Sequence, residues 1–335
     1  MKEQLKDIPD TAETSNYIPE MDPNYVCYGN YADVKQIIES RNFFPVWITG
    51  NAGNGKTQMI KQACAETGRE FVRFNFTVET DENDLLGGMR LVEKNGVTVS
   101  EFCEGPITIA MRRGAIVLLD EIDVGHTNKI MCLQSILEGQ GVLLKAKNEF
   151  VKPAPGFNIF ATSNTKGRGS EDGRFLGTQI MNAAFLDRFA AMMYQDYPDK
   201  KMEQAILQNY FIDIMWLSKD IAIEDVPSAK AKEGEVFIRT LCDWAAQIRE
   251  TYKNQGISEV VTTRTLINIL RGYAIFENRQ KSILYACERY PDDVRDQFVA
   301  IFDKLQDEPI MEAQSEKTVP DSEDANYMSF KQQKF

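Results

Sequence analysis

A glycine-rich loop, placed between a short apolar segment and a helical pattern, constrains this chain more than any other feature of its 335 residues. Residues 50–57 read G-N-A-G-N-G-K-T and fit the phosphate-loop pattern G-x-x-x-x-G-K-[ST]. Residues 46–49 predict a strand and residues 56–65 a helix, which is the context that the pattern requires. Glycines let successive backbone N–H groups point at phosphate oxygens, and the helix adds the positive end of its dipole. We therefore predict a nucleotide-binding loop with contacts from Asn51, Ala52, Gly53, Asn54, Gly55, Lys56, Thr57 and Gln58.

Two acids that follow an apolar run supply the second half of such a site. The run at residues 116–119 leads directly into Asp120 and Glu121. Ligands of open α/β sheets bind at the carboxyl ends of the strands, so Asp120 is predicted to hold Mg²⁺ together with Thr57. Glu121 is predicted to polarise the water that attacks the γ-phosphate, and Lys56 to reach the β- and γ-phosphates. The predicted cofactors are ATP and Mg²⁺.

Three further polar residues are candidates for contact with the γ-phosphate. Asn164 follows the strand predicted at residues 157–162, where an asparagine is either a turn residue or a nucleotide sensor. Arg188 follows an apolar, helix-like stretch, and Arg264 begins a helix farther along the chain. Arginine neutralises charge on a transferring phosphoryl group, although a single arginine is more often a surface or salt-bridge residue. Position and order along the chain favour a nucleotide-sensor role for Asn164 and leave the roles of both arginines open at this point.

The alternation of strand and helix patterns predicts an α/β fold. Strand patterns at residues 46–49, 71–76, 115–119 and 157–162 are separated by helical stretches, notably residues 127–137. This alternation implies a parallel sheet covered by helices on both faces. Beyond residue 198 only helical patterns with apolar stripes remain. We predict a P-loop α/β ATPase domain at 26–197 and a small all-helical lid domain at 198–305, flanked by an acidic lead-in at 1–25 and an acidic, disordered tail at 306–335.

The net charge of −12 argues against a nucleic-acid partner. Residues 1–25 carry six acids and two lysines, and residues 306–335 carry seven acids and three lysines, so the two ends contribute −8. The remaining chain is only mildly acidic, which leaves room for a local basic pore or groove. A nucleic-acid partner is therefore disfavoured rather than excluded.

The apolar and cysteine patterns favour a cytoplasmic protein. The aliphatic run at residues 115–119 is far shorter than the roughly 18 apolar residues of a membrane span, and residues 1–7 lack the apolar run of a secretory signal. The six cysteines are widely spaced without a C-x-x-C pair, and His126 is the only histidine. This pattern favours reduced, buried thiols over a zinc site. We predict no membrane partner, and His126 is left without a role.

The order of these motifs resembles that of the AAA+ ATPases, and most closely the MoxR and chelatase branch. The chain is similar in particular to the family of small ATPase subunits of aerobic cobaltochelatases, the CobS-like proteins. This similarity covers about residues 18–280. It is carried by residues 18–26, by residues 84–87 (D-L-L-G), and by residues 173–179 with the Asn182, Ala183, Asp187 and Arg188 that follow them.

The resemblance implies a hexameric ring in which each nucleotide site is completed by the neighbouring subunit. Arg188 is then the arginine finger that acts in trans, and Arg264 is the lid arginine that acts in cis. Residues 87–99 and 141–157 correspond to two hairpin-bearing insertions that face the pore or a substrate. Family members commonly work with a partner that carries a von Willebrand factor A domain, and the cobaltochelatase ATPase works with a large subunit that inserts cobalt into a corrin. No pattern in this chain itself binds a tetrapyrrole or cobalt.

The motifs and the charge distribution leave three hypotheses for function. The leading one is an ATP-hydrolysing AAA+ ring motor that remodels a partner protein or a metal-chelatase-type complex. The second is a nucleic-acid-stimulated translocase with a basic pore, which the net acidity disfavours. The third is a non-catalytic scaffold gated by ATP, which the presence of a base, a metal ligand and a finger disfavours.

Overall fold

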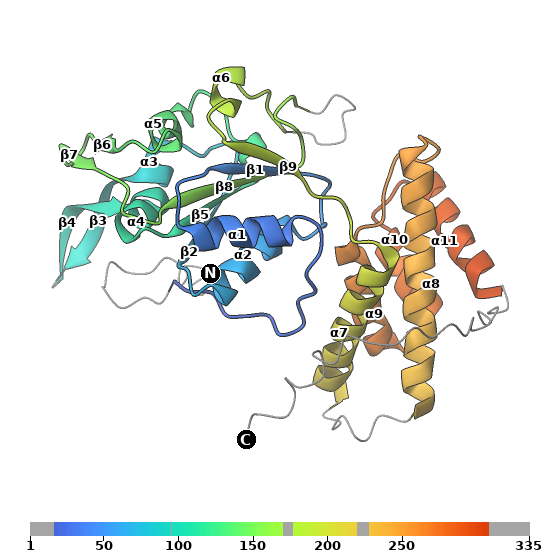
Figure 1. Cartoon of the computed structure of the whole chain (residues 1–335). Helices are drawn as coiled ribbons and strands as arrows, with labels where there is room; N and C mark the ends of the chain where they lie inside the picture. Colours follow the sequence, from blue (N-terminus) through green and yellow to red (C-terminus); the bar gives the residue numbers. More distant parts are fainter. Residues whose placement is uncertain (1–16, 95, 170–176, 220–227, 308–335) are drawn as a thin grey trace, which may run out of the picture.

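The computed structural model describes residues 17–94, 96–169, 177–219 and 228–307, which form an α/β domain and a helical lid (Figure 1). Residues 1–16 of the predicted lead-in, 173–176 of the stretch that carries the family resemblance and 308–335 of the predicted tail lie outside the described residues.

The α/β domain is built on a five-stranded parallel sheet with the strand order β2-β5-β8-β1-β9. The four strands expected from the sequence are confirmed to within one residue at each end, and β9 is an additional edge strand that the sequence patterns did not indicate. The α/β fold and the helical domain that follows it are confirmed. The strands are β1 (Val46–Thr49), β2 (Phe71–Asn75), β5 (Ile116–Asp120), β8 (Asn158–Ser163) and β9 (Ala191–Tyr194).

Alternate residues of the central strands pack into separate cores on the two faces of the sheet. Ile48, Leu118 and Phe160 pack on one face against α1 (Tyr31–Ser40) and α2 (Lys56–Glu66). The neighbouring residues in the same strands, among them Trp47 and Leu119, face the second core. That core is covered by α4 (Pro106–Arg113), α5 (Gln134–Leu137) and α6 (Ala183–Leu186). Both faces of the sheet are therefore buried, as the alternating pattern predicted.

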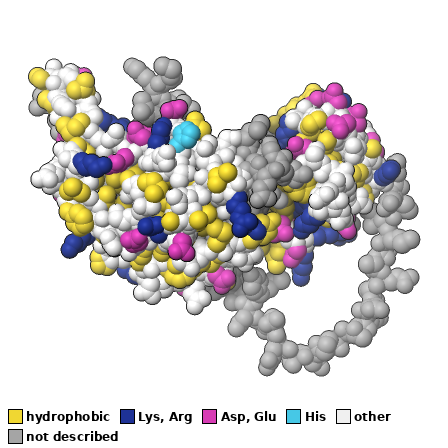
Figure 2. Space-filling model, turned by 90° about the horizontal axis from the view of Figure 1, so that it is seen from above, with side chains coloured by type: hydrophobic (Ala, Val, Ile, Leu, Met, Phe, Trp, Pro, Cys, Tyr) yellow, Lys and Arg dark blue, Asp and Glu magenta, His cyan; other side chains and the backbone are white. Residues whose placement is uncertain are grey.

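Two antiparallel hairpins extend from the α/β domain. The longer pairs β3 (Gly87–Lys94) with β4 (Val97–Glu104), and it follows the short helix α3 (Glu82–Leu86). The shorter pairs β6 (Val142–Leu144) with β7 (Glu149–Val151). Both lie at one end of the domain, away from the lid, and hydrophobic side chains are visible on the surface of that end in Figure 2. The hairpins overlap residues 87–99 and 141–157, for which the resemblance implied two hairpin-bearing insertions.

The helix predicted at residues 127–137 is wrong in its first half. Residues 127–130 form turns and a bend after the 3-10 helix η1 (Ile122–Val124). Within the predicted range, helical structure begins only with the 3-10 helix η2 (Met131–Leu133), which is followed by α5. Ile130, Leu133 and Ile136 are all fully buried, so the apolar spacing was set by contact with the core rather than by a continuous helix. His126, cyan in Figure 2, is exposed on these turns.

The described residues of the lid form five helices that bury their apolar stripes against one another. The aromatic side chains of Phe237, Trp244, Phe298 and Phe302 form the centre of its core, and Trp244 packs edge-on against both Phe298 and Phe302. The stripes seen in the sequence are therefore packing surfaces. The helices are α7 (Lys200–Lys219), α8 (Ser228–Lys253), α9 (Thr263–Phe276), α10 (Arg279–Cys287) and α11 (Asp292–Asp307).

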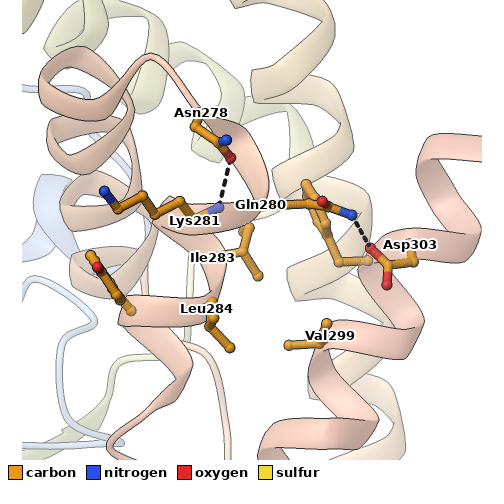
Figure 3. A pocket seen from close by; sticks show the side chains of 9 residues that line it. Asn278, Gln280, Lys281, Ile283, Leu284, Val299 and Asp303 are labelled. Atoms are coloured by element: carbon orange, nitrogen blue, oxygen red, sulfur yellow. Dashed lines mark hydrogen bonds between the residues drawn. The ribbon is translucent and has the colours of Figure 1, made fainter.

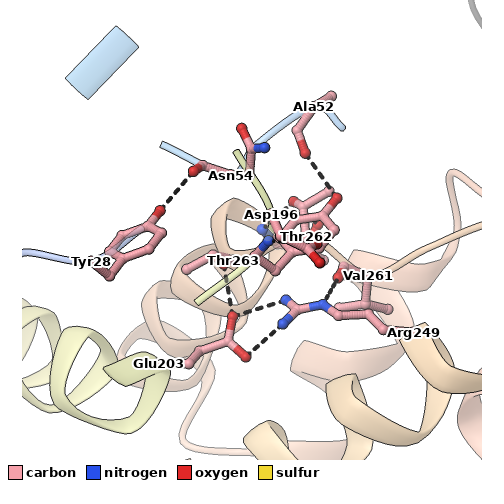
Figure 4. Close-up of polar contacts among 11 residues, drawn as sticks. Tyr28, Ala52, Asn54, Asp196, Glu203, Arg249, Val261, Thr262 and Thr263 are labelled. Atoms are coloured by element: carbon pink, nitrogen blue, oxygen red, sulfur yellow. Dashed lines mark hydrogen bonds and ion pairs between the residues drawn. The ribbon is translucent and has the colours of Figure 1, made fainter. Parts of the chain in front are cut away.

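A buried ion pair ties the lid helices together close to the junction with the α/β domain (Figure 4). Both terminal nitrogens of Arg249 on α8 donate to the carboxylate of Glu203 on α7 at 2.8 Å, and Thr263 Oγ1 donates to the same carboxylate at 2.7 Å. Arg249 Nε also donates to the carbonyl oxygen of Val261 at 2.9 Å. Because Val261 and Thr263 flank the start of α9, this pair fixes the position of that helix end.

We expect Arg249→Ala to lower the free energy of unfolding by about 3–5 kcal/mol, because it leaves the Glu203 carboxylate buried without its ionic partner. Urea unfolding followed by circular dichroism measures the change. The double variant Glu203→Leu with Arg249→Met removes both charges and should be less destabilised than the single variant. A double variant as unstable as Arg249→Ala would contradict the ionic explanation.

Candidate functional site

The glycine-rich loop joins β1 to α2 and adopts a conformation that only glycine tolerates at three positions. Gly50, Gly53 and Gly55 have positive φ angles of 148°, 69° and 81°. A Cβ atom on Gly50 would lie 2.1 Å from the carbonyl oxygen of Gln195, and one on Gly55 would lie 2.5 Å from the hydroxyl of Tyr28. The loop is thus tightly enclosed on its outer side and fits a phosphate group on its inner side.

Lys56 lies in the centre of this loop. Its Nζ donates to the carbonyl oxygens of Gly50 at 2.6 Å and Asn51 at 2.9 Å, and its side chain is buried. Burial lowers the pKa of Lys56 to about 8, although the carboxylates of Asp123, Asp120 and Glu121 act in the opposite direction. The Lys56 ammonium group is therefore held where a phosphate would bind. The nearby carboxylates only partly compensate for its burial.

Thr57 and Asp120 form a pair of oxygen donors at the edge of the sheet. Thr57 lies in the first turn of α2. Its Oγ1 donates to the Asp120 carboxylate and lies 3.0 Å from Oδ1 and 3.2 Å from Oδ2. Asp120 ends β5 and is only 4% exposed, and the hydroxyl of Thr162 on β8 also donates to it. A hydroxyl and a carboxylate side by side are ligands that Mg²⁺ prefers, so these residues fit the metal of Mg-ATP.

Arg73 is a neighbour of this pair that the sequence patterns did not identify. It lies on β2, the strand next to β5, and its Nε and a terminal nitrogen lie 2.8 Å and 2.6 Å from Asp120 Oδ2. Its side chain is half exposed, whereas that of Asp120 is buried. Arg73 therefore offsets the charge of Asp120 from the solvent side. An arginine in the middle of a predicted strand gives no sequence signal for this contact.

Glu121 follows Asp120 and has an unusual backbone conformation. Its φ and ψ angles of 57° and 41° place a non-glycine residue in the left-handed region, which carries a conformational cost and is frequent at functional sites. Its backbone N–H donates to Thr162 Oγ1 at 3.2 Å, so Thr162 contacts both acids. The Glu121 side chain is exposed at the end of β5, where a general base could reach a water molecule.

Asn164 lies just beyond the end of β8, close to the lysine of the loop. Its Oδ1 is 3.4 Å from Lys56 Nζ. A buried carboxylate fixes its backbone, since Asp123 Oδ2 accepts hydrogen bonds from the N–H groups of Asn164 at 3.2 Å and Thr165 at 3.0 Å. Burial raises the pKa of Asp123, and its other oxygen has no hydrogen-bond partner among the described residues. Asp123 thus positions the segment that carries Asn164.

The structure does not bring Arg188 to the phosphate loop of its own chain. Arg188 follows α6, where its Nε donates to Glu138 Oε1 at 2.8 Å and a terminal nitrogen donates to the carbonyl oxygen of Ala184. Neither partner belongs to the phosphate loop or to the carboxyl ends of the strands. About a quarter of its side chain is accessible.

Arg264 belongs to the lid but lies near the loop. It is exposed in the first turn of α9, and its positive charge is one of the influences that lower the pKa of Lys56. The residue two positions earlier, Thr262, caps α9 by accepting from the N–H of Thr265 at 3.1 Å. A Cβ atom on Gly53 would lie 2.8 Å from Thr262 Cβ, so the lid is packed directly against the loop.

The site is distinct from a hollow of about 470 Å³ on the lid surface (Figure 3). That hollow lies between α10 and α11, and its lining residues include Lys281, Leu284 and Val299. None of its lining residues belongs to the phosphate loop, β5 or β8. The chemistry-bearing side chains are instead gathered at the carboxyl edge of the sheet.

The comparisons with known proteins agree with the expected resemblance. Residues 45–189 match the family described as "AAA domain (dynein-related subfamily)". The chain is 27% identical over 270 residues to the aerobic cobaltochelatase subunit CobS of a Sinorhizobium species, a match that covers 80% of this chain and 76% of that protein. It is 26% identical over 239 residues to midasin of Dictyostelium discoideum, which covers 68% of this chain but only 4% of midasin.

Among solved structures, NtrX from Brucella abortus in complex with ADP is similar to this chain with a TM-score of 0.49 and 17% sequence identity. The match covers 87% of this chain and 58% of that one. No helix in the described part of the chain is both long and apolar enough to cross a membrane.

We expect nucleotide binding to be linked to protonation of Lys56. Its pKa of about 8 lies below the usual lysine value, so the unliganded protein loses this proton as the pH rises through 8. Bound phosphates favour the ammonium form, so binding of ADP at pH 8 should take up about half a proton and weaken at higher pH. Calorimetry in buffers of different ionisation enthalpy measures the uptake.

The same measurement at pH 6.5 should show little proton uptake at Lys56, because the unliganded amine is already protonated there. Lys61→Met, which removes an exposed lysine of α2, is the matched control and should keep the uptake at pH 8. Equal proton uptake at both pH values would show that Lys56 is not the linked group.

Proposed function

We propose that the protein is a Mg²⁺-dependent ATPase whose turnover drives the remodelling of a partner protein or of a chelatase-type complex. The match of residues 45–189 to the AAA domain family supports this proposal. Similarity to the cobaltochelatase subunit CobS over most of both chains supports an ATPase of that type. Assembly into a hexameric ring is part of this proposal.

One observation carries the proposal: the residues needed for hydrolysis converge at the carboxyl edge of the sheet. Thr57 is hydrogen-bonded to Asp120, Lys56 is 3.4 Å from Asn164, and Thr162 connects Asp120 to the backbone of Glu121. They come from the loop after β1 and from the ends of β5 and β8, three adjacent strands of the sheet. Burying a lysine and carboxylates together at this edge costs free energy of folding, so stability alone does not explain their position.

Bound Mg-ATP supplies the phosphoanhydride bond to be cleaved and a metal ion that neutralises charge on the phosphates. Lys56 and the loop N–H groups bind the phosphates, and Thr57 and Asp120 hold the metal. Glu121 accepts a proton from the attacking water, and Asn164 orients that water or the γ-phosphate. The buried position of Asp120 and Lys56 strengthens these interactions, because the local dielectric constant is lower than in water.

A ring arrangement accounts for the position of Arg188. In its own chain this arginine is paired with Glu138 and lies apart from the loop, whereas phosphoryl transfer benefits from an added positive charge. We assign Arg188 to the site of the neighbouring subunit and Arg264 to the site of its own chain. The exposure of Arg264 and its electrostatic effect on Lys56 of the same chain support the second assignment.

The long hairpin is the surface that we assign to the client or partner. Leu91 on β3 is 76% exposed and Val97 on β4 is 61% exposed, and Met89 is also exposed. Isolated two-stranded hairpins with apolar surface are marginally stable in water, which favours a protein contact in the assembled state. A partner with a von Willebrand factor A domain is the class that we propose, and the comparisons do not favour a nucleic-acid translocase.

We expect Glu121→Gln to bind ATP with nearly unchanged affinity and to lose about 10²-fold or more in turnover, because the amide cannot accept the proton of the attacking water. Steady-state phosphate release and equilibrium binding of ATP measure the two quantities. Glu79→Gln, which changes an exposed acid paired with Lys129, should leave turnover unchanged. Hydrolysis by Glu121→Gln at the parental rate would remove Glu121 from its assigned role.

The trans assignment of Arg188 predicts complementation between two inactive variants. Arg188→Ala and Lys56→Ala should each hydrolyse ATP slowly, because one lacks the finger and the other lacks the phosphate-binding amine. In mixed rings, an intact loop can meet an intact finger at some interfaces, so mixing should restore part of the activity. Activity of the mixture equal to the average of the separate variants would show that Arg188 does not act across an interface.

A further inference from the structure

Two tyrosines from different segments donate hydrogen bonds to carbonyl oxygens on the outer side of the phosphate loop (Figure 4). Tyr28, in the segment before α1, donates from its hydroxyl to the carbonyl oxygen of Asn54 at 2.6 Å. Tyr197, just after β9, donates to the carbonyl oxygen of Ala52 at 2.9 Å. The sequence patterns gave no role to either residue.

Each of these bonds fixes the direction of an N–H group as well as that of a carbonyl. The peptide unit is planar and trans, so its N–H points opposite to its C=O. Holding the carbonyl of Ala52 outward therefore turns the N–H of Gly53 inward, and holding that of Asn54 outward turns the N–H of Gly55 inward. These inward N–H groups are the ones that a phosphate-binding loop offers to its ligand.

Such restraint matters because both N–H groups belong to glycines. Gly53 and Gly55 have φ angles of 69° and 81°, but glycine adopts negative φ about as readily, so these two peptide units could otherwise rotate. A third contact limits Gly53, since Thr262 of the lid packs against it. The loop is therefore held from outside by the lead-in segment, by the chain after β9 and by the lid.

The tyrosines are themselves held firmly. The Tyr197 ring lies 4.1 Å from the guanidinium carbon of Arg249, which is fixed by Glu203. The segment of Tyr28 is fixed where the N–H of Asn30 donates to Gln195 Oε1 at 3.1 Å. Burial raises the pKa of Tyr28 to about 12 and raises the pKa of Tyr197 as well, so both hydroxyls stay protonated and remain donors.

We propose that Tyr28 and Tyr197 are positioning residues that orient the peptide units 52–53 and 54–55 so that the loop is preorganised for the phosphates of its ligand. The proposal rests on the nucleotide binding assigned above and names how the loop achieves it. It implies that both tyrosines act on the phosphates alone and are indifferent to the base and the sugar.

The test compares inorganic pyrophosphate with ADP as ligands of the full chain, by calorimetry at one fixed Mg²⁺ concentration. Tyr28→Phe and Tyr197→Phe each remove one hydroxyl and keep the ring. We expect each to weaken pyrophosphate binding by about threefold to tenfold, the usual effect of one hydrogen bond. ADP binding should weaken by the same factor, and the double variant should show the product of the two single effects, because separate peptide units are affected.

Tyr210→Phe is the matched control, because the hydroxyl of Tyr210 on α7 donates to Asp22 Oδ2 in the lead-in at 3.4 Å. It should leave pyrophosphate affinity unchanged. Unchanged pyrophosphate affinity in both Tyr28→Phe and Tyr197→Phe, with or without a lower melting temperature, would overturn the proposal. Weaker binding of ADP alone would also overturn it, since the tyrosines would then contact the nucleoside. A parental chain that binds neither ligand would instead remove the proposed function itself.

Discussion

One buried carboxylate, that of Asp120, holds the site together. It receives hydrogen bonds from Thr57 after β1, from Thr162 on β8 and from Arg73 on β2, while Asp120 itself ends β5. The strand order makes this possible, because β2, β5, β8 and β1 are consecutive in the sheet and all run in the same direction. Any shift of one strand along its neighbours would separate the Asp120 carboxylate from its hydrogen-bond donors. The geometry of the site therefore depends on the register of the sheet.

The charges at this edge of the sheet are only partly balanced. A phosphate ligand would interact with the incompletely paired ammonium group of Lys56. Lys56 is buried among loop carbonyls, and its pKa is lowered because burial outweighs the attraction of the nearby acids. Asp123 is buried too, and the backbone of Asn164 and Thr165 stabilises only one of its oxygens. Groups in such positions are costly to the folded state without a ligand, which explains why they are confined to the edge of the sheet.

The sequence predicted the parts of the site that follow a local rule. Asp120 and Asn164 lie at the ends of apolar strands, and Lys56 follows another such strand after the glycine-rich loop. Parallel strands bring their carboxyl ends to one edge of the sheet, so these positions could be expected to lie close together. Arg73, Tyr28 and Tyr197 follow no such rule, because a single polar or aromatic residue in a strand or loop has many uses. The false helix at residues 127–130 has a related cause: burial of Ile130 and Leu133 against the core imitates helical spacing. The role of Arg188 depends on a second subunit and stays a prediction.

The contacts around the phosphate loop also give the lid a mechanical connection to the ligand. The Glu203–Arg249 pair fixes the start of α9, Thr262 at that start packs against Gly53, and Tyr197 packs against Arg249 while it holds the carbonyl of Ala52. A displacement of the lid would therefore move the peptide units of the loop. Conversely, a ligand that fixes those peptide units would restrain the lid, and the coupling free energy is the same in both directions. Because Arg264 lies in the first turn of the same helix, a lid held by this connection also keeps a positive charge near Lys56. The buried ion pair at the base of the lid thus supports the residues that hold the phosphate loop from outside.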